Sequence, residues 1–147
     1  AHLAALIAAI GHRTVSHIIV THGHRDHAAL APALARATGA PVLAFGQAGA
    51  GRSPVMQALS LPDGGEAADP TLAPDILIGE GDTVAGPGWL LRVMHTPGHM
   101  GGHLALGWND AVFCGDTVMG WASSLVSPPD GDMAQYMASL ARLAALG

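Results

Sequence analysis

Apolar residues recur at two different spacings along this chain, and the spacings predict an alternation of helices and strands. Residues 3–10 repeat at the three-to-four-residue spacing of a helix, and Gly11 follows as its end. The β-branched run 15–20 predicts a strand buried on both faces. A second helix is predicted over 28–38 and a short strand over 42–45. This order of elements is typical of an α/β domain.

The second half of the chain begins with a long segment, 46–75, which is rich in Gly, Pro, Ala and Ser and has one helical turn near 55–59. The chain ends on a predicted helix, 132–146, with Asp132 as its N-cap. The apolar face of that helix is expected to consist of Met133, Tyr136, Met137, Leu140 and Leu143. Short strands are predicted between these segments, over 76–78, 83–84, 89–95, 103–106 and 111–114.

Composition narrows the class of protein. Half of the 147 residues are hydrophobic and only 12% are charged, which favours one folded domain, 1–147, with a sizeable core. No apolar run reaches the roughly 18 residues that a membrane span needs. The formal net charge is −5 and all six basic residues are arginines. A nucleic-acid groove usually carries a basic stripe, so nucleic acid is an unfavoured partner. A lone cysteine, Cys114, excludes an internal disulfide and favours a reducing, cytoplasmic setting.

Nine histidines are the unusual feature of the composition, and six of them fall in two clusters. The first cluster, 21–27, follows the predicted strand 15–20 and reads T-H-G-H-R-D-H. Alternate side chains of an extended stretch point the same way, so His22, His24 and Asp26 can converge on one point. His27 enters the following helix and can face a neighbouring point. Imidazole and carboxylate ligands suit zinc, and also iron or manganese.

The second cluster comprises His95, His99 and His103, and its motif T-P-G-H directly follows the predicted strand 89–95. Pro97 and Gly98 predict a tight turn that would hold His99 rigidly, as a metal ligand requires. Asp116 follows the strand 111–114, where a carboxylate can bridge two cations. His103 has three open interpretations: it could form a hydrogen bond that orients a metal ligand, protonate a leaving group, or stabilise the turn.

The motif H-x-H-x-D-H, then T-P-G-H, then a strand ending in G-D resembles the metallo-β-lactamase superfamily. The resemblance implies an αββα sandwich with two metal ions at the edge of the sheets, and Asp26 as a catalytic residue that orients the nucleophile. It also implies a ligand set: His22, His24 and His99 for one ion, Asp26 and His27 for a second, and Asp116 as the bridge.

Finer motifs point to branches of that superfamily. The sequence T-P-G-H-M-G-G-H is similar to the glyoxalase II pattern, and the segment after Asp116 resembles a lactamase-like branch that includes an endoribonuclease. Compared with the family pattern, the chain lacks the first pair of strands. It also lacks the C-terminal end, where a histidine in a G-H-G-like loop would complete the second site beyond Gly147.

The leading functional hypothesis is a metal-dependent hydrolase with two zinc ions, in which a metal-bound hydroxide attacks an ester, a thioester or a related bond. One alternative is an oxidoreductase with a single iron that resembles the persulfide dioxygenases of the same superfamily. Another is a metal-dependent endoribonuclease. Scattered arginines, the absence of lysine and few aromatic residues favour a small acyl substrate over RNA. Self-association into a homo-oligomer stays open.

Overall fold

The computed structural model describes residues 1–59 and 68–146, and the predicted order of helices and strands is confirmed there. Residues 60–67, inside the long segment predicted at 46–75, lie outside the described part. The described elements are α1 (His2–Ile10), β1 (Ile18–Ile19), α2 (Arg25–Ala28), α3 (Ala31–Thr38), β2 (Val42–Ala44), α4 (Pro54–Ala58), β3 (Ile76–Leu77), β4 (Thr83–Gly86), β5 (Trp89–His95), β6 (Leu104–Trp108), β7 (Ala111–Phe113), the 3-10 turn η2 (Gly115–Thr117) and α5 (Met133–Ala144).

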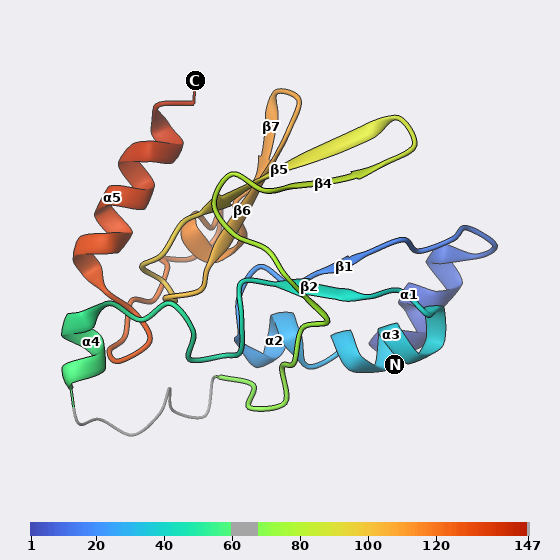
Figure 1. Ribbon diagram of the computed structural model, residues 1–147, viewed down its shortest axis with the longest axis horizontal. Coiled ribbons are helices and arrows are strands. Elements are labelled where there is room, and N and C mark those ends of the chain that lie inside the picture. Colours follow the sequence, from blue (N-terminus) through green and yellow to red (C-terminus); the bar gives the residue numbers. More distant parts are fainter. Residues whose placement is uncertain (60–67, 147) are drawn as a thin grey trace.

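Two β-sheets form the centre of the molecule (Figure 1). Strands β1, β2 and β3 make a parallel sheet in that order, and β4 to β7 make an antiparallel sheet. A cluster that includes Leu43 of β2, Val93 of β5 and Leu104 of β6 packs the two sheets against each other. These side chains are buried because each sheet turns its apolar face toward the other.

Helices flank this pair of sheets. Ala28 of α2 and Ala31 of α3 pack against Val42 of β2 in a second buried cluster, on the face of the parallel sheet away from the first. Helix α5 is bonded to the end of β5, where the Arg142 guanidinium donates to the carbonyl of His95. The layers therefore run helix, sheet, sheet, helix, which is the αββα arrangement that the sequence predicted (Figure 1).

Local details of the helices differ from the prediction. The helix expected over 28–38 begins only at Ala31, as α3, and the short helix α2 comes before it. Helix α3 ends as predicted at Gly39, which has a left-handed φ of 75°. Asp132 caps α5 by accepting from the backbone amides of residues 134 and 135, as expected. The prediction for the apolar face of α5 was wrong in part, because Met133 and Met137 are 56% and 58% exposed. Ser139 is buried instead and donates to the carbonyl of Pro97.

Three strand ends place the sequence motifs near one another. The chain leaves β1 into the segment with His22, leaves β5 into the turn with His99, and leaves β7 into η2 with Asp116. A backbone bond from the amide of Leu104 to the carbonyl of Thr21 joins the first of these segments to β6. Among the described helices, none has the length and apolar character needed to cross a membrane.

Candidate metal centre

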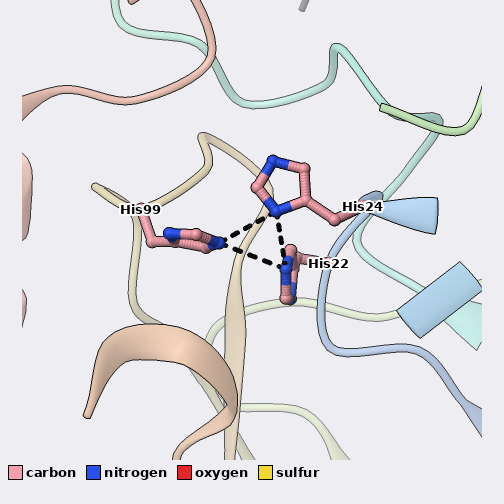
Figure 2. A group of neighbouring side chains, drawn as sticks. All are labelled: His22, His24 and His99. Atoms are coloured by element: carbon pink, nitrogen blue, oxygen red, sulfur yellow. Dashed lines mark hydrogen bonds between the residues drawn. The ribbon is translucent and has the colours of Figure 1, made fainter. Parts of the chain in front are cut away.

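Three histidines from two distant segments meet at the ends of β1 and β5 (Figure 2). The Nε2 atom of His22 lies 3.0 Å from Nδ1 of His24 and 3.3 Å from Nε2 of His99. The third side of the triangle, from His99 Nε2 to His24 Nδ1, is 2.9 Å. His22 and His99 are buried and His24 is half-buried. The three ring nitrogens therefore face one common point.

The chemistry of these nitrogens fits a cation. The Nδ1–H of His99 donates to the carbonyl of Leu125 at 2.6 Å, so a neutral His99 has a bare lone pair on Nε2. Three ligands at the roughly 2.0–2.1 Å zinc–nitrogen distance of a tetrahedral site lie about 3.3 Å from one another. The observed separations of 2.9–3.3 Å are close to that value. A positive ion at the common point would remove the repulsion between the converging lone pairs.

A second group of ligand atoms adjoins the first. It consists of His22, His27 and Asp116, with ligand atoms that all lie within 4.8 Å of one another. The Oδ1 atom of Asp116 is 3.2 Å from His27 Nε2, and its Oδ2 atom is 3.7 Å from His99 Nε2. Each carboxylate oxygen thus faces a histidine of a different group. Asp116 has the placement that a bridging ligand needs.

Asp26 lies at the rim and not in either group. Its side chain is 79% exposed, and its Oδ2 atom is 3.6 Å from His27 Nε2. The expected convergence of Asp26 with His22 and His24 is not seen, because α2 begins at Arg25 and ends the extended alternation there. The carboxylate is instead next to His27, the residue with which the family resemblance pairs it.

His103 lies behind the ligands and is fully buried. Its Nε2 accepts from the backbone amide of Asp116 at 3.2 Å, so the neutral ring carries its proton on Nδ1. That Nδ1 is 2.9 Å from the hydroxyl of Thr96 and 3.3 Å from the hydroxyl of Thr117. Of the three interpretations of His103, this geometry favours a bond to the backbone of a ligand. A fully buried ring is poorly placed to protonate a leaving group.

Burial favours the neutral form of three histidines at this site, His22, His24 and His103. Burial, followed by the charges of neighbouring histidines, lowers the pKa of His22 far below its ordinary value. Burial and the neighbouring His99 also lower the pKa of His24. The pKa of His103 is lowered to about 3, again mainly by burial. Neutral imidazoles are the form that binds metal ions.

Several residues that hold Asp116 in place could not be identified from the sequence. The hydroxyl of Ser124 donates to the carbonyl of Asp116 at 2.6 Å, and the hydroxyl of Tyr136 donates to the carbonyl of Thr117 at 2.9 Å. The hydroxyls of Thr96 and Thr117 both lie within hydrogen-bonding distance of Nδ1 of His103. Only the adjacency of Thr117 to the G-D motif, and of Thr96 to T-P-G-H, could have drawn attention to them.

Comparison with known proteins agrees with the geometry of the site. The family model described as the metallo-beta-lactamase superfamily matches residues 2–147. The hydroxyacylglutathione hydrolase of Pseudomonas aeruginosa (strain LESB58) is 34% identical over 135 residues, which cover 90% of this chain and 43% of the relative. The enzyme of the same name from Xylella fastidiosa (strain M23) is 45% identical over 69 residues, which cover 47% of this chain and 26% of the relative. The chain spans less than half the length of these curated relatives.

A solved structure is similar across almost the whole chain. TTHA1623 in a di-iron-bound form superposes with a TM-score of 0.72 and is 28% identical, covering 99% of this chain and 71% of its own. The family model, in turn, matches all but the first residue of the chain. This chain therefore belongs to the metallo-β-lactamase superfamily.

Proposed function

We propose that this protein is a metal-dependent hydrolase that holds two divalent ions. The observation that carries the proposal is the placement of Asp116, whose two carboxylate oxygens face histidines of two adjoining ligand groups. Hydroxyacylglutathione hydrolase is the name of the curated relatives, which supports hydrolysis as the reaction.

The side chains of this site have separable tasks in such a reaction. His22, His24 and His99 would hold one ion, and His27 with Asp116 would hold the second. Bound there, the ions would act as Lewis acids and lower the pKa of a water molecule. Asp26, exposed beside His27, can orient a water at the rim and accept its proton on Oδ2. The neutral ring of His103 keeps Asp116 in place through its backbone amide.

Zinc is the proposed ion, because three nitrogens at these separations suit a tetrahedral site. Iron is the second candidate, because mixed imidazole and carboxylate ligands also bind it. The similar protein TTHA1623 has been described in a di-iron-bound form. A reducing compartment, the cytoplasm, is proposed because Cys114 is a free thiol.

The proposed substrate is a small acyl ester or thioester. The segment that follows Asp116 is apolar and exposed, with Val118, Trp121 and Leu125 at 52%, 90% and 64% exposure. Leu125 belongs to the site itself, since its carbonyl accepts from His99. An apolar rim favours the binding of an acyl group. RNA recognition depends on lysine and arginine side chains, and this chain has no lysine.

The test is a side-by-side assay of the protein, expressed at its full natural length and loaded with zinc or iron. One arm contains acyl-glutathione thioesters and simple esters, and the other contains single-stranded RNA. We expect metal-dependent hydrolysis of the acyl compounds at a higher kcat/KM than cleavage of RNA. Cleavage of RNA without acyl hydrolysis would identify a nuclease. Oxygen consumption with a persulfide and a single bound iron would identify an oxidoreductase.

A further inference from the structure

A buried ion pair lies close to the ligand groups without belonging to them. The Nε and Nη2 atoms of Arg52 are 2.9 and 2.6 Å from Oδ1 of Asp130. The two side chains are 16% and 7% exposed. The pair is largely shielded from water, so the attraction between its two charges is stronger than at the surface. Substitution of this pair should therefore have a larger effect than substitution of an exposed one.

The ion pair belongs to a junction of three chain segments. Arg52 is in the segment 49–53, Asp130 in the segment 127–132, and the third segment is the turn 97–102 that carries His99. The first and third are in backbone contact, because a Cβ atom on Gly101 would lie 2.5 Å from the amide nitrogen of Arg52. The second and third are joined by a bond from the amide of Asp132 to the carbonyl of Gly98, at 2.8 Å.

A further bond closes the junction between the first and second segments. The hydroxyl of Ser53 donates to Oδ2 of Asp132 at 2.7 Å, while Oδ1 of Asp132 caps α5. Arg52 and Ser53 thus bind the segment 127–132 at two points. A shift of that segment away from residues 52–53 would weaken these bonds.

His99 is held from two sides by the chain that leads into this junction. Its ring donates through Nδ1 to the carbonyl of Leu125. Its backbone is packed against Gly131, where a Cβ atom would lie 3.1 Å from the carbonyl oxygen of His99. The turn itself contains three glycines, at positions 98, 101 and 102, and therefore has few side chains with which to fix its own shape.

We propose that Arg52 and Asp130 are positioning residues, which set the place of His99 in the first ligand group and thereby the metal affinity of that group. The inference rests on the proposed function in one respect, that His99 is a metal ligand. A ligand held rigidly in the binding geometry needs no reorganisation when the ion arrives, so loosening the support weakens binding.

The experiment measures zinc affinity by chelator competition in the background His27→Ala, which leaves the first group as the site under study. Asp130→Asn removes the charge without changing the shape of the side chain. We expect it to raise the zinc dissociation constant about tenfold or more, as changes behind metal ligands commonly do. Arg52→Lys, which keeps the charge but not the two-nitrogen contact, should give a smaller increase.

Glu80→Gln is the matched control. Glu80 pairs with Arg142 through two bonds of 2.8 and 2.6 Å, but this ion pair is exposed and lies outside the junction. The same acid-to-amide change there should leave the dissociation constant within twofold of the parent. Urea midpoints of the metal-free variants are measured in parallel, because a purely structural ion pair would lower the midpoint without changing the zinc affinity.

The outcomes separate this inference from the proposed function. If the parent binds zinc and Asp130→Asn binds it equally well, the positioning role is wrong and the hydrolase proposal stands. If the parent binds no divalent ion, both are wrong. If Asp130→Asn does not fold, Arg52→Lys decides the question with the same comparison.

Discussion

Asp116 lies between the two candidate ligand groups. Its Oδ1 faces His27 and its Oδ2 faces His99, and its backbone is held from both sides, by His103 at the amide and by Ser124 at the carbonyl. The backbone bonds do not involve the carboxylate. A change confined to the carboxylate should therefore affect chemistry and leave the fold largely intact.

Asp116→Asn tests that separation. An amide keeps the shape of the side chain but replaces one oxygen with an NH₂ group, which cannot bind a cation. We expect kcat for the best acyl substrate to fall by roughly a hundredfold or more, while the urea midpoint changes little. Turnover near that of the wild type would show that Asp116 is only a structural residue of η2.

Protonation of His103 gives a pH prediction. Its pKa is lowered from an unfolded value of 6.5 to about 3, mainly by burial, so the unfolded chain binds the proton more tightly. The stabilisation is complete above pH 6.5 and is lost as the pH falls toward 3. His22 and His24 act in the same direction. For metal-free protein, the free energy of unfolding should drop by about 2 kcal/mol from His103 alone between pH 6.5 and 4.5.

The measurement is a series of urea titrations across that pH range. His103→Gln offers an acceptor near the position of Nε2 without a titrating ring, and its pH dependence should be shallower than that of the wild type. Equal slopes for the two proteins would mean that His103 does not contribute to acid sensitivity.

Residue types and spacing were sufficient to predict most of the candidate ligands, because the metal-binding chemistry is concentrated in two short motifs. The place of Asp26 was not predictable from alternation, since the start of α2 at Arg25 depends on packing. The role of His103 could not be derived either. Its partners Thr96, Asp116 and Thr117 come from two segments that only the fold brings together.

At the scale of elements, helix α5 and the turn after β5 depend on each other. Tyr136 packs so tightly on Gly98 that a Cβ atom there would lie 2.2 Å from the Cα atom of Tyr136. Gly98 also has a φ of +140°, which other residues rarely adopt. The sequence predicted α5 and its cap from local signals. Its prediction of the buried face was right only in part, because Tyr136 and Ser139 contact the turn while Met133 and Met137 are exposed.

Gly98→Ala is expected to destabilise the protein by several kcal/mol, since both the clash and the strained φ oppose the new methyl group. Gly120→Ala is the control, because nothing lies within 4 Å of the position of its Cβ atom. The measurement is the free energy of unfolding from urea titration. A loss of stability no larger than that of the control would contradict the close packing of α5 on this turn.

At the scale of the whole molecule, the two sheets bring the ends of β1, β5 and β7 to one place. Neither ligand group is contained in a single segment, because His99 joins residues of the first histidine cluster and Asp116 comes from η2. The proposed two-metal chemistry would thus be a property of the assembled sandwich. Sequence motifs predicted the participants, and the packing of the sheets determines their distances.

The most direct test of the account is the metal content of the protein, expressed at its full natural length and purified without chelators. Elemental analysis should find two divalent ions per chain in the wild type. His24→Ala and His27→Ala each remove a ligand of one group only, so each variant should retain about one ion at matched purity. His22→Ala should likewise retain about one ion, because the Nε2 atom of His22 faces the first group. A wild-type protein that contains no divalent ion, or only one, would contradict the two-metal centre proposed for this chain.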